Sequence, residues 1–218
     1  MNPLKYAFGI TLGKFLGFVV RHREIEIDQA KVRAIQGMPP SRNLKELSGL
    51  QGRLAYIRIF ILNLASRCHP LSHLIKKGAP FKWDDSCQNT FDSIKRYLLS
   101  PPVLGAPVPG KPLLLYIAAQ EHSLAAPCAK ENSEGKEMTF YYLSRTLVGA
   151  ELNYSPIEKM CLALMFAIQK LRHYMQAHTV YVISKVDPIK YILSRPVLHG
   201  RLTKWAIILE QYDLVHVS

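Results

Sequence analysis

The sequence is poor in cysteine and has no long apolar run, and each shortage excludes a class of protein. Its four cysteines are scattered without short pairing, so neither a disulfide framework nor a four-thiolate zinc site is indicated. No apolar run approaches the ~18 residues of a membrane span, and the first residues carry no signal-peptide core. We therefore expect no membrane contact and an intracellular setting, in the cytoplasm or nucleus.

Acidic residues are also scarce. The chain has 16 Asp and Glu against 28 Lys and Arg, a net charge of +12. Residues 1–100 hold 16 of the basic and 7 of the acidic side chains, so most of the excess lies there. Such a balance favours a polyanionic partner, foremost nucleic acid, although a solvated basic surface without a specific ligand is the plain alternative. The first half is the better candidate for contact with phosphate.

Local patterns predict the elements of the first hundred residues. β-Branched and aromatic residues on either side of a polar turn at 21–23 predict a hairpin over 14–27. Asp28 is placed to cap a helix over 29–36, and Asn43 with Glu46 forms a capping box for a helix to about Ile57. Two more helices are expected, over 60–76 and, capped by Asp84, over 85–99. A proline-rich stretch at 101–112 then marks the main domain boundary.

The second half predicts an α/β layer fold. Apolar runs at 113–118 and 139–143 predict strands, and further strands are expected at 179–184 and 213–217. Ser155 to Glu158 combine a capping box with proline at the first helical position, which opens a long amphipathic helix. Shorter helices are expected after Asp187 and over 202–212. The alternation of strands and helices is typical of a mixed sheet covered by helices.

Several motifs resemble one family along nearly the whole chain. They are Lys14-Phe15-Leu16-Gly17 with Ile25-Glu26-Ile27-Asp28, residues 43–61, Phe81-Lys82-Trp83 with Phe91 and Lys95, Tyr142-Leu143-Ser144-Arg145 with Glu151, and Asn153-Tyr154-Ser155 with Glu158-Lys159. In order and spacing they resemble the reverse transcriptase region of gypsy-class LTR retrotransposon polyproteins, of the kind common in plant genomes. The family activity would be RNA-directed DNA polymerase and ribonuclease H, with Mg²⁺.

The resemblance implies four regions. Residues 1–36 would be the end of the palm with a primer-grip-like hairpin, 37–78 a helical thumb, 79–106 a connection helix and linker, and 107–218 an RNase H-like domain truncated at its C-terminal end. The fold class is α/β, with an α+β thumb and connection before the mixed-sheet domain. The paired aspartates of the polymerase site would lie before Met1, so no polymerase metal site is expected in this chain.

The same resemblance implies lost nuclease chemistry. The family holds two divalent ions with carboxylates, because cations about 3.5–4 Å apart need anionic oxygens between them. The three aligned positions are Ile117, Met160 and Lys185. Glu158 points elsewhere, since a helix turns about 100° per residue, and Asp187 is better interpreted as a helix cap. We therefore expect no catalytic residue, no bound metal and no cofactor.

Nucleic-acid binding is expected on the helix that begins after Asn43. If its Leu44, Leu47, Leu50 and Leu54 side faces the core, Lys45, Arg53 and Arg58 contribute to one basic surface. The partners would be an RNA–DNA or DNA duplex, bound through its backbone, and the remainder of the polymerase polyprotein.

Other signals were weighed against plainer interpretations. Cys68, His69 and His73 offer three zinc ligands without a fourth at finger spacing, so solvated histidines are favoured. Trp83 and Trp205 are better explained as core anchors than as base-stacking platforms. Pro127 lies inside an expected strand over 124–130, which indicates either a short strand or a degenerate copy.

Three functions remain open from the sequence. The first is a non-catalytic nucleic-acid-binding fragment. The second is an enzyme with residual RNase H or reverse transcriptase activity, through unconventional ligands or when joined to upstream polymerase sequence. The third is a pseudogene product without activity.

Overall fold

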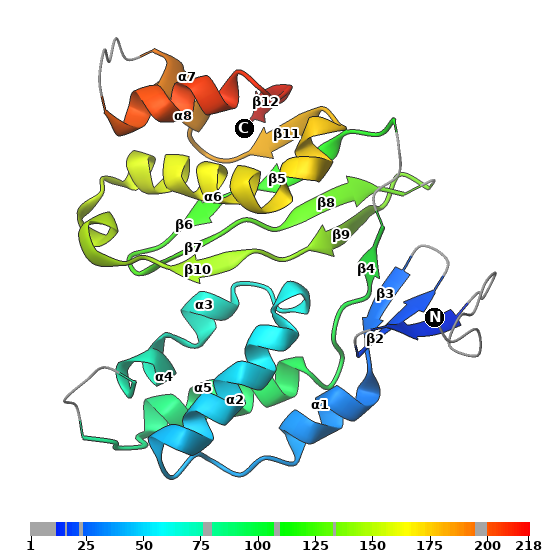
Figure 1. The fold of residues 1–218 in the computed structure, drawn as a ribbon, viewed down its shortest axis with the longest axis vertical. Coiled ribbons are helices and arrows are strands. Elements are labelled where there is room, and N and C mark those ends of the chain that lie inside the picture. The colour runs from blue at the N-terminus through cyan, green and yellow to red at the C-terminus, as the bar shows by residue number, and fades with distance from the viewer. Residues whose placement is uncertain are drawn as a thin grey trace, which may run out of the picture.

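The computed structural model describes residues 12–15, 17–21, 24–75, 80–106, 110–132, 134–194 and 200–218. The chain is a mixed α/β protein built as two lobes, one above the other in Figure 1. The buried apolar side chains form two corresponding clusters, one running from Ile27 to Leu104 and the other from Leu113 to Leu209. The chain therefore passes from the first lobe to the second within the proline-rich stretch.

An antiparallel sheet opens the first lobe. Its strands lie in chain order: β1 (Leu12–Phe15), β2 (Phe18–Arg21), β3 (Glu24–Ile27) and β4 (Leu104–Gly105). The expected hairpin is confirmed as β2 and β3, although its turn residues His22 and Arg23 lie outside the described residues. Gly17, with φ of 74°, turns the chain between β1 and β2, where a Cβ would lie 2.5 Å from the Tyr56 hydroxyl.

Three helices of the first lobe begin at the predicted caps. They are α1 (Gln29–Gln36), α2 (Leu44–Tyr56) and α5 (Asp85–Tyr97). A side-chain oxygen of Asp28, Asn43 or Asp84 accepts a backbone N–H in the first turn of each, at 2.8–3.0 Å. Each cap satisfies an N–H group that the helix itself leaves without a partner.

The single helix expected over 60–76 is wrong. The described part of this segment holds three short helical pieces: η2 (Arg58–Phe60), α3 (Leu64–Arg67) and α4 (His69–His73). Asn63 interrupts the run with a left-handed φ of 54°, and Pro70 has no N–H to continue α3, so it starts a new helix instead. The expected end at Lys76 lies outside the described residues.

The core face of α2 also needs one correction. Leu47, Leu50 and Leu54 are buried as expected, but Leu44 is 47% exposed. Leu44 is the first residue of the helix, one turn before Leu47, and lies beyond the end of the buried stripe. The buried stripe of α2 is therefore shorter than the leucine spacing predicts.

Two sheets form the second lobe. The larger has the order β12-β11-β5-β8-β9 and the smaller the order β10-β7-β6. The strands are β5 (Leu113–Tyr116), β6 (Ala118–Ala119), β7 (Ser123–Ala125), β8 (Cys128–Glu131), β9 (Glu137–Tyr141), β10 (Ser144–Thr146), β11 (Val180–Ile183) and β12 (Leu214–Val217). β11 runs parallel to both β5 and β12, and the other pairs are antiparallel.

Helices cover this lobe. They are η3 (Gly149–Asn153), α6 (Pro156–Gln176), α7 (Pro188–Leu193) and α8 (Arg201–Leu209). The Ser155 capping box is confirmed, with the Ser155 N–H donating to Glu158 Oε2 at 3.0 Å, and the Ser155 hydroxyl donates to the same oxygen at 2.9 Å. Figure 1 shows α6 lying across the sheet with α7 and α8 beyond it. Trp205 is a core anchor, and Trp83 packs on the core of the first lobe, as expected.

Pro127 divides the strand expected over 124–130. It lies between β7 and β8, where its carbonyl accepts the Tyr116 N–H at 3.0 Å. The residue therefore marks the point at which the chain leaves one sheet for the other. This favours a short strand over a degenerate copy of the element, because a proline is tolerated at a position whose backbone N–H is not needed for pairing between strands.

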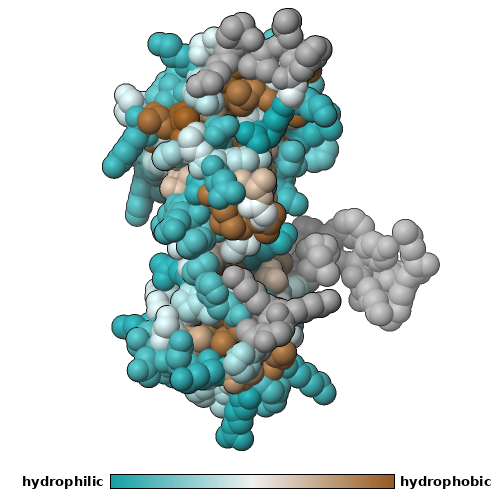
Figure 2. Space-filling model, turned by 90° about the vertical axis from the view of Figure 1, so that its left-hand side faces the viewer, coloured by the Kyte–Doolittle hydropathy of each residue, from teal (hydrophilic) through white to brown (hydrophobic). Residues whose placement is uncertain are grey.

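Direct hydrogen bonds join the lobes. Tyr142 N–H donates to the Ile59 carbonyl at 3.0 Å, and Ala65 N–H donates to Ser144 Oγ at 3.1 Å. On the face shown in Figure 2, hydrophobic residues gather in separate small patches among hydrophilic ones. Within the described ranges, no helix has the length and apolarity needed to cross a membrane.

Candidate functional site

Two of the three aligned positions lie at one end of the larger sheet. Ile117 directly follows β5, and Lys185 comes two residues after β11. These strands are parallel neighbours, and the Ile117 N–H donates to the Ile183 carbonyl at 3.2 Å. The carboxyl ends of parallel strands meet at the same edge, which is where open α/β sheets place their ligands.

The start of α6 spans the same end. Lys159 Nζ donates to the carbonyl of Glu121 at 3.1 Å, and Cys161 Sγ contacts the Pro188 carbonyl at 3.7 Å. Glu121 lies between β6 and β7, and Pro188 opens α7 after β11. Met160, between these two contacts, packs on the core cluster that contains Ile117.

None of the three positions offers a metal ligand of the kind two-ion sites use. Ile117 is apolar and 5% exposed, Met160 has a thioether, and the exposed Lys185 carries a positive charge that repels a cation. Burial raises the pKa of the neighbouring Cys161 to about 12, so its thiol stays protonated at neutral pH. The three positions at which the resemblance predicts metal-binding carboxylates therefore offer no anionic oxygen.

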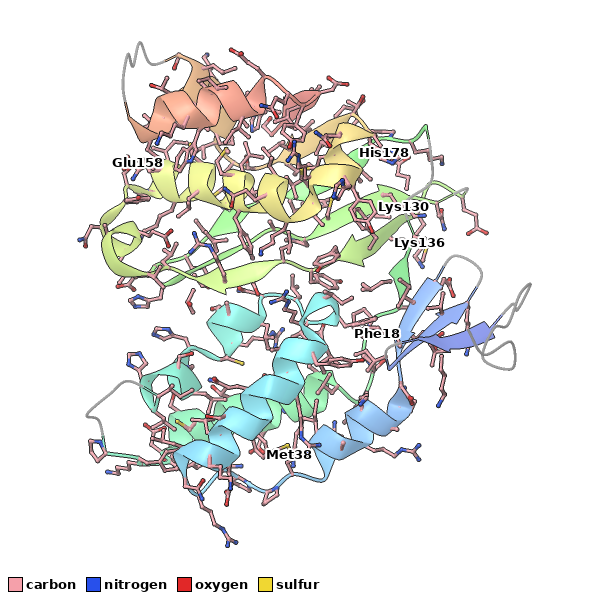
Figure 3. The ribbon with its side chains drawn as sticks, in the orientation of Figure 1. Phe18, Met38, Lys130, Lys136, Glu158 and His178 are labelled. Atoms are coloured by element: carbon pink, nitrogen blue, oxygen red, sulfur yellow. The ribbon has the colours of Figure 1, made fainter. Side chains whose placement is uncertain are left out.

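The two nearby carboxylates have structural partners. Glu158, labelled at the start of α6 in Figure 3, closes the capping box and pairs with Arg201 at 3.0 Å. Asp187 caps α7 by accepting the Lys190 N–H at 2.9 Å, as expected, and lies 3.7 Å from His216 Nδ1. In the part of the chain that the structure describes, no group of three or more His, Cys, Asp or Glu side chains is arranged to hold a metal ion.

The basic residues of α2 and its exit are all exposed. Lys45 lies in the first turn, Arg53 in the last turn, and Arg58 just beyond the helix. Arg53 lines a groove of about 590 Å³ with Lys31 and Tyr56, and Arg58 lines a second cleft of about 590 Å³ against the other lobe. Gly52 lines both. Lys45 lines neither groove, and Arg53 and Arg58 lie in different grooves on the two flanks of α2, so the structure does not gather the three predicted residues into one groove.

Three basic residues that line these grooves were not predicted from the sequence as part of the binding surface: Lys31, Arg145 and Lys170. Arg145 forms a two-pronged ion pair with Glu151, at 2.6 and 2.8 Å. The Arg145 guanidinium holds the pKa of Glu151 below its usual range. Arg145 and Glu151 lie within the motif that carries the resemblance. Lys31 and Lys170 have no sequence signal, since each is one lysine on the polar face of a helix.

A mixed sheet with β11 parallel to β5 and β12, and with α6 packed across it, is an RNase H-like fold; the helical lobe precedes it. Residues 108–212 match the model of the RNase H-like domain found in reverse transcriptase. The second half of this chain is accordingly an RNase H-like domain of the reverse transcriptase type.

Relatives among polyproteins match nearly the whole chain. Over 225 residues it is 30% identical to the "Retrovirus-related Pol polyprotein from transposon opus" of Drosophila melanogaster, covering 98% of this chain and 22% of that protein. It is 27% identical over 224 residues to the "Transposon Tf2-3 polyprotein" of Schizosaccharomyces pombe, covering 98% of this chain and 16% of that protein. The chain thus corresponds to the reverse transcriptase RNase H-like region of retrotransposon polyproteins and spans about a fifth of their length.

Solved structures share the fold. The foamy viral protease-reverse transcriptase in complex with dsDNA matches 95% of this chain and 44% of its own, with a TM-score of 0.76 and 20% identity. The same viral protein was also solved in complex with an RNA/DNA hybrid. The match to that structure covers 94% of this chain and 29% of the viral chain, with a TM-score of 0.75 and 23% identity. Both lobes of this chain therefore occur together, in a similar arrangement, in a reverse transcriptase.

Proposed function

We propose that this chain is a non-cleaving, duplex-binding region of a gypsy-class reverse transcriptase, with a thumb in the first lobe and a catalytically degenerate RNase H-like domain in the second. The observation that carries the proposal is the chemistry of Ile117, Met160 and Lys185. Two of these lie where parallel strands end and the third where α6 begins. A two-ion nuclease requires carboxylates there, and the residues present are a hydrocarbon, a thioether and a cation.

The two basic grooves beside α2 support the binding half of the proposal. They combine Lys31 and Arg53 on one flank with Arg58, Arg145 and Lys170 on the other. Backbone phosphates are contacted mainly by such side chains, without regard to base sequence. The foamy viral protease-reverse transcriptase, which shares this fold, has been solved in complex with dsDNA and with an RNA/DNA hybrid, which makes a duplex the first ligand to test.

The finer assignment rests on the order of motifs. Residues 14–28 would be the end of the palm and residues 43–61 the thumb, followed by the Phe81-Lys82-Trp83 segment and the Ser144-Arg145 and Glu151 motifs. This order resembles gypsy-class elements of the kind common in plants. Polymerase activity and Mg²⁺ would then reside in other parts of the polyprotein.

Duplex binding at several salt concentrations tests the proposal. Binding is expected to be insensitive to sequence and to weaken steeply with salt, each phosphate contact adding about −0.9 to the slope of log K against log salt on B-form DNA. Arg53→Gln with Arg58→Gln should flatten that slope by roughly one to two units. In the same samples a labelled RNA–DNA hybrid should remain intact in Mg²⁺.

The matched control removes two charges elsewhere. Lys136 and Lys204 are exposed on the second lobe, and Lys136 is labelled next to β9 in Figure 3. Lys136→Gln with Lys204→Gln should leave the slope nearly unchanged. Equal slopes for the two double variants would show that the α2 face is not the binding surface and that the +12 charge acts diffusely.

A further inference from the structure

Three histidines from the two lobes meet at the junction. His69 and His73 lie on α4, and His122 lies in the turn between β6 and β7. We call this group the junction histidines. His73 and His122 are exposed to solvent and His69 is half-buried, so the group is accessible. The sequence predicted separate, solvated histidines at positions 69 and 73. In the structure the two side chains contact each other on α4.

The geometry of the pair on α4 is unusual. His69 Nε2 and His73 Nε2 are 3.0 Å apart, with the two rings nearly perpendicular at 89°. The two Nε2 atoms are therefore close enough to share one ion. The other face of the group is closed by His122, whose ring stacks on that of His69 with centroids 4.5 Å apart and an interplanar angle of 1°.

This arrangement suits a transition-metal ion. Imidazole nitrogen ligates Zn²⁺ at about 2.0–2.1 Å, so an ion can lie within bonding distance of two nitrogens that are 3.0 Å apart. Histidines at i and i+4 on a helix are a spacing that presents both rings to one ion. Imidazole favours Zn²⁺, Cu²⁺ and Ni²⁺ over the oxygen-seeking Mg²⁺ and Ca²⁺.

Neighbouring groups define the ligand set. Cys68 directly precedes α4 but is not part of the ligand set that we assign to the ion. Glu121 lies 3.6 Å from His122 and is highly exposed, where it adds negative charge to the neighbourhood. Since no group of three ligating side chains is already gathered among the described residues, water must complete the coordination.

We propose that His69 and His73 chelate a borderline divalent metal ion, Zn²⁺ in the first instance, at the junction of the lobes. His122 acts as a positioning residue: by stacking on the His69 ring it holds that ring in the chelating orientation from the opposite lobe. Metal binding thereby links the helical lobe to the RNase H-like domain. The site is separate from positions 117, 160 and 185 and does not depend on duplex binding.

Zn²⁺ affinity of the full chain tests the proposal, measured by competition with a chromophoric chelator in the absence of nucleic acid. One equivalent is expected to bind. His69→Gln and His73→Gln should each weaken binding by about tenfold or more, because a single imidazole remains. His122→Gln should weaken it by roughly three- to tenfold, the cost of ordering a side chain that is no longer held. His173→Gln, an exposed histidine on α6, is the matched control and should have no effect.

A spectroscopic measurement on the unmodified chain keeps the test independent of how the variants fold. The Cu²⁺-loaded protein should show two nitrogen ligands by electron paramagnetic resonance, and the Co²⁺-loaded protein should show no thiolate charge-transfer band. Affinity should fall on acidification, since imidazole must be unprotonated to bind metal. Absence of saturable binding below ~100 µM Zn²⁺, or one-to-one binding that survives loss of both His69 and His73, would overturn the proposal and leave a simple histidine–histidine hydrogen bond.

Discussion

At the scale of single residues, Arg145, which lines the cleft between the lobes, forms a two-pronged ion pair with Glu151. Both side chains are mostly shielded from solvent, and two short bonds join them. Glu151 Oε2 also accepts the Val148 N–H at 3.0 Å, and Arg145 lies over the Phe166 ring at 5.4 Å. The ion pair thus joins η3 to β10, and the same arginine contacts α6 through the Phe166 ring.

Replacing Glu151 by Gln should lower the free energy of unfolding by about 1–2 kcal/mol at neutral pH, because it removes a charged hydrogen-bond partner. Arg145 lowers the pKa of Glu151. The stabilisation is therefore present above the usual glutamate range and is lost as the pH falls through the lowered pKa. Chemical denaturation at neutral and acidic pH measures this, and the difference from the unmodified chain should shrink in acid.

Glu134→Gln is the control for that measurement, since Glu134 is an exposed turn residue and the substitution removes the same charge. It should change stability by less than about 0.5 kcal/mol. Similar losses for the two variants would show that the Arg145 pair contributes no more than general electrostatics.

At the scale of elements, α2 carries two glycines where a helix former would be more stable. A Cβ added at Gly49 or Gly52 would meet nothing within 4 Å, so packing does not require either glycine. Glycine costs about 1 kcal/mol relative to alanine in a helix interior. Gly52 lies where the two grooves adjoin, and we propose that close approach of a duplex to the helix backbone offsets this cost.

Gly49→Ala with Gly52→Ala should therefore raise the melting temperature and weaken duplex binding. Thermal unfolding and duplex titration of one preparation measure both. Gly135→Ala should lower the melting temperature instead, because Gly135 has φ of 76°, which alanine adopts only with strain. Unchanged or tighter duplex binding by the α2 variant would remove the close-approach explanation.

Most elements could be predicted from the sequence because their signals are local. Asp28, Asn43, Asp84 and Ser155 cap helices through atoms two or three residues away. The segment 58–73 could not, since its apolar spacing favours one helix, whereas the structure interrupts it at the left-handed Asn63 and again before Pro70. The role of Pro127 likewise depends on a partner strand that no local pattern identifies.

At the scale of the whole molecule, the candidate site is assembled from segments far apart in sequence. Ile117, Met160 and Lys185 were found through the family resemblance, because apolar and basic residues carry no catalytic signal of their own. The pairing of β5 with β11 and the contacts at the start of α6 bring their segments to one end of the sheet. Of the junction histidines, the sequence indicated His69 and His73 as possible ligands, and only His122 was missed, because it lies 49 residues beyond His73.

Restoring the family carboxylates should recover metal binding at a cost in stability. The triple variant Ile117→Asp, Met160→Glu and Lys185→Asp is expected to bind Mn²⁺, measured by calorimetry, whereas Lys185→Asp alone is not. Because Ile117 is buried, an aspartate there should lower the free energy of unfolding of the metal-free protein by about 2–7 kcal/mol. A folded triple variant without Mn²⁺ affinity would show that the three positions do not form one site.

Cleavage of an RNA–DNA hybrid by the unmodified chain tests the central claim most directly. The purified protein is incubated with an end-labelled hybrid in Mg²⁺ or Mn²⁺, with a chelator-treated sample as control and gel retardation to confirm that the hybrid is bound. The account predicts bound, intact hybrid under both ions, because no carboxylate occupies the three aligned positions. Cleavage that requires the ion and is abolished by chelator would contradict this prediction and would show that the domain is an active nuclease.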